Sequence, residues 1–141
     1  MQIRQHQGKH FPFLSLFSVF GLQAFLCCVV ALPIQIGISQ TGPEQLNLWD
    51  ILGLTFWSIG FIFESIADRQ LTLFKANPTN KNAVLNTGVW RYSRHPNYFG
   101  EALLWWGFAF LALSTEYGMW GGLGTLVINF LLVRISGCAH A

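Results

Sequence analysis

Four long apolar runs with very few charged residues restrict what this chain can fold into. They cover residues 11–38, 46–67, 98–115 and 117–135. A helix needs roughly 20 apolar residues to cross a bilayer core, and each run approaches or exceeds that length. Only 10% of the 141 residues are charged, whereas soluble proteins carry about 25%. The sequence therefore predicts an all-α fold, a multi-pass transmembrane bundle of about four spans in a single membrane domain over residues 1–141.

The basic residues predict the orientation of this bundle. All eight precede the first run, lie between the second and third, or stand at the end of the fourth: Arg4, Lys9, Arg69, Lys75, Lys81, Arg91, Arg94 and Arg134. The opposite loops, 39–45 and 115–116, contain none. Because Lys and Arg in short loops stay on the cytoplasmic side, we predict an integral membrane protein with both termini and the 68–97 loop in the cytoplasm. Either a bacterial inner membrane or an endoplasmic reticulum would suit it, and the net charge of +2 does not indicate nucleic acid binding.

Two kinds of residue stand out within the apolar runs. Pro33 lacks a backbone N–H, so we expect it to kink or end the first helix. Glu64 and Glu101 each lie about one turn inside a run, where an ionisable group is costly and usually has a partner. One interpretation is an ion pair, with Arg69 or the Arg91/Arg94 cluster. The other is a role in proton handling or cofactor binding.

The polar segment between the second and third runs carries most of the chemistry. Residues 68–75 continue the second helix, and 77–82 and 86–88 are turn signals. Cations, an imidazole and an amide then stand directly before or at the start of the third run. They belong to residues 88–101, Gly-Val-Trp-Arg-Tyr-Ser-Arg-His-Pro-Asn-Tyr-Phe-Gly-Glu. Pro96 favours the start of a helix at this point. The free backbone N–H groups of that first turn, together with the side chains of Arg91 and Arg94, could bind an anion. The alternative is that both arginines only contact lipid headgroups.

Glycine and cysteine are less informative about function. Gly118, Gly121, Gly122 and Gly124 predict close helix packing at the start of the fourth run. The three cysteines (Cys27, Cys28 and Cys138) have neither disulfide nor metal-ligand spacing. His95 has no second ligand at a useful spacing, so no metal site is predicted.

Three motifs carry a specific resemblance to a known family. They are Phe-Lys-Ala-Asn-Pro at 74–78, the 88–101 segment, and Trp-Trp-Gly at 105–107. With them, the chain resembles the steroid 5-alpha-reductase C-terminal-domain family over about residues 48–137. The sterol reductases and the isoprenylcysteine carboxyl methyltransferases are more distant relatives, which share an Arg-His-Pro-x-Tyr-x-Gly core. The resemblance implies a soluble nucleotide cofactor at the cytoplasmic face and a lipidic substrate that enters from the bilayer.

The resemblance also implies roles for particular residues. Catalysis would involve Glu101 and Tyr98, and the cofactor would be contacted by Lys75, Trp90, Arg94, His95, Asn97 and Tyr98. Since an acidic residue at Glu101 is typical of the reductases, the leading interpretation is an NADPH-dependent oxidoreductase acting on a CH–CH bond of a lipid or steroid-like molecule. The enzymatic alternative is an S-adenosylmethionine-dependent methyltransferase of a membrane substrate. Because family members are usually longer, the third interpretation is a truncated, non-catalytic membrane fragment or assembly subunit.

Overall fold

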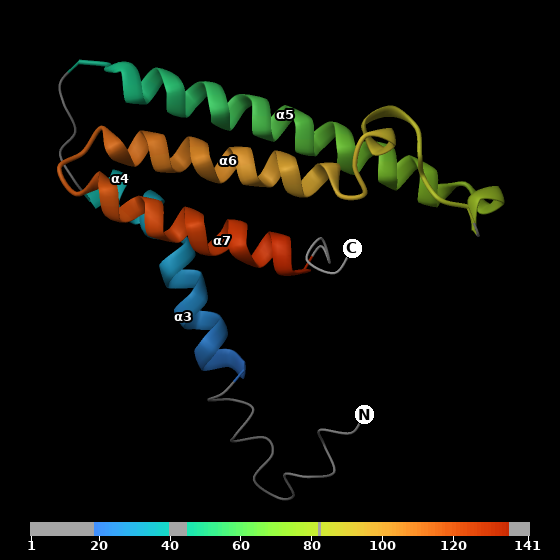
Figure 1. Ribbon diagram of the computed structural model, residues 1–141, viewed down its shortest axis with the longest axis horizontal. Helices are drawn as coiled ribbons and strands as arrows, with labels where there is room; N and C mark the ends of the chain where they lie inside the picture. The colour runs from blue at the N-terminus through green and yellow to red at the C-terminus, as the bar shows by residue number, and fades with distance from the viewer. Residues whose placement is uncertain (1–18, 40–44, 82, 136–141) are drawn as a thin grey trace, which may run out of the picture.

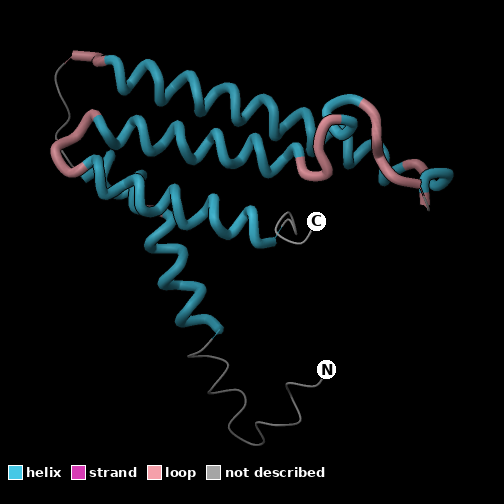
Figure 2. The backbone as a smooth tube through the Cα atoms, viewed as in Figure 1, coloured by secondary structure: helices cyan, strands magenta, loops and turns pink. Residues whose placement is uncertain are grey.

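A computed structural model of the protein describes residues 19–39, 45–81 and 83–135. Within these ranges it is all-α, as predicted, with five α-helices and three short 3-10 helices. Figures 1 and 2 show α5, α6 and α7 running side by side, with the connecting loops gathered at the two ends and α3 leaving the stack at an angle. Predictions for residues 11–18, Asn82, Cys138 and both termini lie outside the described residues.

The first apolar run forms two helices instead of one. Helix α3 covers Gly21–Val30, α4 covers Leu32–Ser39, and their axes differ by 53°. Pro33 is buried as the second residue of α4, so its ring stands where an N–H would otherwise bond to the preceding turn. The predicted break at Pro33 is confirmed.

Helix α5, Leu48–Ala76, is the longest element and unites the second apolar run with the polar residues that follow it. It begins at a capping box, in which the Asn47 side chain accepts from the N–H of Asp50 while Asp50 Oδ2 accepts from the N–H of Asn47 at 2.9 Å. Its 29 residues extend about 44 Å. A bilayer core is only about 30 Å thick, so one end of α5 must project beyond any bilayer that it crosses.

Helices α6 and α7 complete the stack. Helix α6 covers Pro96–Leu113 and starts at the predicted proline, and α7 covers Gly121–Ile135 after the 3-10 turn η5, Gly118–Trp120. By length and composition, α5 is one candidate membrane span, and the bent α3–α4 pair is a second if it is counted as one span. Pro96, Asn97 and Glu101 lower the apolar character of α6, and α7 is short. The two further spans that the sequence predicts therefore stay a prediction.

Glycines bring α5 and α6 into close contact along an antiparallel seam. A Cβ on Gly60 would lie 2.5 Å from the α6 backbone, and a Cβ on Gly100 would lie 2.6 Å from the backbone nitrogen of Glu64. Gly53 and Gly107 repeat this arrangement seven residues away on each helix. Such small residues allow two helix backbones to approach each other. The seam fixes α5 on α6 and thereby places the loop that joins them.

The glycines near the start of α7 pack as predicted, with one exception. A Cβ on Gly121 would lie 3.1 Å from Pro33, and Gly124 lies against carbonyl oxygens at the α3–α4 bend. Gly118 lies against the backbone at the end of α6. The prediction is wrong for Gly122, because nothing lies within 4 Å of the position of its Cβ.

Candidate cofactor-binding site

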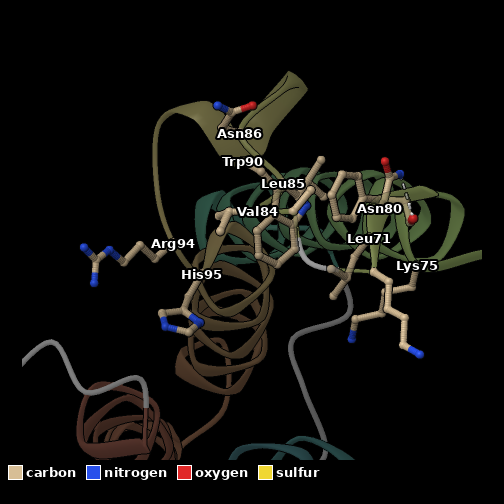
Figure 3. Close-up of a pocket in the computed structure, with 12 residues that line it drawn as sticks. Leu71, Lys75, Asn80, Val84, Leu85, Asn86, Trp90, Arg94 and His95 are labelled. Carbon is tan, nitrogen blue, oxygen red and sulfur yellow. Dashed lines mark hydrogen bonds between the residues drawn. The ribbon is translucent and has the colours of Figure 1, made fainter. Parts of the chain in front are cut away.

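An open cavity of about 980 Å³ lies where α5 extends beyond the start of α6 (Figure 3). This volume is at the upper end of the roughly 300–1,000 Å³ that is usual for small-molecule sites. Its apolar lining comes from α5, the connecting loop and the 3-10 turn η4 (Gly88–Arg91): Leu71, Phe74, Ala83, Val84, Leu85 and Trp90. Its polar lining comes from Lys75, Asn80, Lys81, Asn86, Arg94 and His95. The site therefore offers aromatic and aliphatic surface beside positive charge.

Trp90 forms part of this lining because its indole is anchored to α5. Its Nε1–H donates to the carbonyl oxygen of Ala67 at 3.0 Å, and the neighbouring N–H of Val89 donates to Gln70 Oε1 at 3.1 Å. Gly88 has φ +60°, and a Cβ there would collide with the Gln70 side chain. The predicted turn at Gly88 is therefore present, and it is held against α5.

The far side of the cavity is held by two asparagines at the end of α5. The Asn77 side chain accepts from the N–H and the hydroxyl of Thr79, at 3.1 and 2.8 Å, and so caps the 3-10 turn η3, Pro78–Asn80. Asn80 Nδ2 donates to the carbonyl oxygen of Phe74 at 3.0 Å. These bonds end α5 and turn the loop back over the cavity.

The charged side chains around the cavity are all cations. Lys75, Lys81 and Arg94 are exposed, and no carboxylate occurs among the described residues of the lining. In Figure 3, Arg94 and His95 lie on one side of Trp90 and Lys75 lies on the other. Cations spread around a partly apolar cavity raise the local concentration of anionic ligands. A molecule that carries an anionic group and a flat ring fits this arrangement.

Four of the six predicted cofactor contacts line the cavity, namely Lys75, Trp90, Arg94 and His95. Asn97 and Tyr98 lie in the first turn of α6 and are not part of the lining. The Tyr98 ring stacks on the His95 ring at 5.1 Å with an interplanar angle of 13°. Asn97 Oδ1 is buried without a hydrogen-bond donor. An unsatisfied buried acceptor is unusual and is consistent with a binding role.

Of the two predicted catalytic residues, Tyr98 lies in the first turn of α6 and Glu101 lies further into the bundle. Glu101 is half-buried one turn beyond Tyr98, and Glu64 packs against the backbone of Gly100. Among the residues that the structure describes, no ion pair joins Glu101 to Arg91 or Arg94, or Glu64 to Arg69. The ion-pair interpretation is therefore wrong: Arg69 is five residues from Glu64 on α5, a spacing that does not bring two side chains together, and Arg91 and Arg94 precede α6.

Apart from Trp90, sequence reasoning missed the apolar lining of the cavity. Leu71 and Phe74 follow from the helical spacing of α5, which points them to one side. Val84 and Leu85 interrupt an otherwise polar loop, and Val84 keeps 85% of its surface exposed. The apolar pair Val84 and Leu85 within this polar loop could have indicated that the loop lines a cavity.

Comparison with known proteins gives a family match and two distant relatives. The model of a family described as "Protein of unknown function (DUF1295)" matches residues 1–141. An uncharacterised protein of Schizosaccharomyces pombe is 26% identical over 136 residues, which is 82% of this chain and 40% of that protein. A probable O-methyltransferase of Ustilaginoidea virens is 29% identical over 104 residues, which is 73% of this chain and 35% of that protein. The chain therefore spans less than half the length of these relatives, and no solved structure matches it.

Proposed function

This chain belongs to the DUF1295 family, and we propose that it forms the cofactor-binding part of a membrane-embedded, S-adenosylmethionine-dependent methyltransferase with a lipidic substrate. The cation-rimmed cavity beside Trp90 is the observation that carries this proposal. The relative named as a probable O-methyltransferase favours methyl transfer over the reduction that the sequence motifs favour.

The side chains in and near the cavity suit the adenine ring and the carboxylate of this cofactor. Trp90 and Phe74 supply aromatic surface for an adenine ring. Lys75, Lys81 and Arg94 supply charge-assisted donors for the carboxylate of the methionine part. Asn97 Oδ1 is an unpaired acceptor one turn away, suited to a hydroxyl or amino donor.

The cofactor supplies an electrophilic methyl group when it is bound. The chain's residues then have two tasks, which are to orient that group and to keep water from it. Glu101 and Tyr98 follow the lining residue His95 along α6 in the direction of the bundle, from which a lipidic acceptor would arrive. In this proposal Glu101 takes the proton from an acceptor hydroxyl, and Tyr98, stacked on His95, shapes the passage between the two sites.

The proposal includes the predicted four-span arrangement and orientation. Helices α6 and α7 would cross the bilayer together with α5 and the bent α3–α4 pair. The projecting end of α5 and the 77–95 segment would lie in the cytoplasm, where S-adenosylmethionine is available. The surrounding bilayer would supply the substrate.

An NADPH-dependent reductase of a carbon–carbon double bond is the second candidate. It is favoured by one observation, the presence of three cations and no carboxylate among the described residues of the lining, which suits a cofactor with several phosphates. In that case Glu101 or Tyr98 would supply the proton that accompanies hydride transfer.

Binding to the purified chain in nanodiscs distinguishes these candidates. We expect S-adenosylmethionine to bind, and we expect Arg94→Ala and Lys75→Ala each to weaken binding about tenfold, because each removes a charge-assisted contact. Arg69→Ala is the matched control, since Arg69 is an exposed cation of α5 outside the cavity lining. NADPH binding without S-adenosylmethionine binding would establish the reductase instead. If a folded chain binds neither molecule, it is a non-catalytic fragment or subunit.

A further inference from the structure

A second cavity, of about 390 Å³, lies at the opposite end of the bundle. It is formed by α4, the first turn of α5 and the end of α6, far from the end of α5 that carries the basic cavity (Figure 1). Its apolar lining comes from Pro33, Ile34, Gly37, Ile38, Phe108 and Leu111. Its polar lining comes from Asp50, Ser114 and Thr115.

The polar groups of this second cavity present acceptors and no free donors. The Ser114 hydroxyl donates to the carbonyl oxygen of Leu111 at 2.7 Å, and the Thr115 hydroxyl donates to that of Ala112, also at 2.7 Å. A hydroxyl has one proton, so only lone pairs of these two oxygens remain for a ligand. Asp50 is an acceptor as a carboxylate, and one of its oxygens already accepts from the Asn47 N–H.

This pattern specifies the chemistry of a ligand. A group that only donates and carries positive charge complements three acceptors, and a primary ammonium has three donors and no acceptor. Asp50 is the single charged residue among the described residues of the lining. The apolar side suits a hydrocarbon chain, and Ile38, 81% exposed, leaves the cavity open to its surroundings.

We propose that this cavity binds a membrane phospholipid with a primary ammonium headgroup, with the ammonium at Asp50 and one acyl chain along α4. Along α5, Asp50 lies 21 to 25 residues from Leu71 and Lys75 of the basic cavity, a separation of about 32–38 Å, which exceeds the roughly 30 Å core of a bilayer. The lipid would therefore come from the leaflet opposite the basic cavity. This binding does not depend on the methyl-transfer proposal.

Native mass spectrometry of the full chain, released from nanodiscs of equal phosphatidylethanolamine and phosphatidylcholine content, tests the proposal. We expect the chain to retain phosphatidylethanolamine at least about fivefold over phosphatidylcholine, as charge-assisted hydrogen bonding predicts. Gly37→Phe should abolish retention, because nothing lies within 4 Å of a Cβ at Gly37 and the ring can grow into the cavity. Gly122→Phe is the matched control, since Gly122 is equally open and lies outside the cavity.

A second variant tests the ammonium contact separately from the shape of the cavity. Asp50→Asn keeps an acceptor for the Asn47 N–H but removes the charge, so we expect lipid retention to continue while the headgroup preference disappears. Equal retention of both lipids by the unaltered chain overturns the proposal. Undiminished phosphatidylethanolamine retention by Gly37→Phe also overturns it, and so does an unchanged headgroup preference in Asp50→Asn. If Gly37→Phe fails to fold, the Asp50→Asn result decides the question.

Discussion

Trp90 illustrates how a single side chain can hold the site together and face a ligand. Its indole N–H is used by the carbonyl oxygen of Ala67, so in this position the ring offers a ligand its face and not a hydrogen bond. The resemblance to known enzymes implies cofactor contact at Trp90 but not this constraint. Stacking on an adenine ring is the contact that remains available.

Replacing Trp90 separates these two roles. Trp90→Phe keeps an aromatic ring but loses the bond to Ala67, so we expect the free energy of unfolding to fall by about 1 kcal/mol with a small loss of cofactor affinity. Trp90→Ala should lose most of the affinity as well. Chemical unfolding in micelles and binding in nanodiscs measure the two effects, with the exposed Trp120→Phe as the control. Equal affinities for Trp90→Phe and Trp90→Ala would contradict a stacking role.

Asn97 offers a second prediction at this scale. Because its buried Oδ1 has no donor in the ligand-free protein, Asn97→Leu should raise the free energy of unfolding by about 1 kcal/mol. The rise in melting temperature on adding S-adenosylmethionine should disappear in the same variant. Asn97→Asp places a buried charge there and should be less stable than the unaltered chain. A full ligand-induced rise in Asn97→Leu would remove Asn97 from the binding site.

At the scale of the elements, the α5–α6 seam controls where the site residues lie. Gly60 on α5 meets Gly100 on α6, and the next residue along α6 is Glu101. The seam thus fixes the position of Glu101 along the bundle axis and the direction of α6 from its first residue, Pro96. Any side chain added in the seam would push the two helices apart.

Gly60→Ala tests the seam directly. The added methyl group would lie 2.5 Å from the Leu104 backbone nitrogen, so we expect a loss of about 1–3 kcal/mol in unfolding free energy. Gly122→Ala is the matched control on α7, where the methyl group meets nothing and the better helix propensity should leave stability unchanged or raised by up to about 1 kcal/mol. Thermal unfolding followed by circular dichroism compares them. Similar melting temperatures for both variants would mean that the helices are not held at this separation.

For the whole molecule, the central question is how many helices cross the bilayer. The structure supports one or two candidate spans, whereas the four apolar runs of the sequence predict about four. The end that carries the basic cavity is cationic, and the opposite loop contains Glu116 and no basic residue. This asymmetry is the basis for the proposed orientation.

Cysteine labelling checks this topology. In a chain whose native cysteines are replaced by serine, Glu116→Cys should react with a membrane-impermeant maleimide from outside the cytoplasm. Lys81→Cys should react only after the membrane is permeabilised. Labelling of both positions from the same side would mean that α6 does not cross.

The sequence predicts the parts of this molecule that depend on local chemistry. The all-α class, the break at Pro33 and the start of α6 at Pro96 follow from backbone rules and are confirmed. The α5–α6 seam depends on which residues meet across the two helices, and no local pattern specifies that. The single domain and the assigned roles of Glu101 and Tyr98 stay predictions.

Helix α5 is continuous from its capping box to Lys75, and this has a consequence for how the protein responds to its lipid environment. The vertical span between Asp50 and Lys75 is set by a rigid rod and cannot adjust to the bilayer except by tilting. In a thicker membrane the opening of the basic cavity would lie closer to the headgroups, and in a thinner membrane it would lie further from them. If the proposed topology and function hold, the thickness of the bilayer would set the depth at which the soluble cofactor and the membrane-borne acceptor meet.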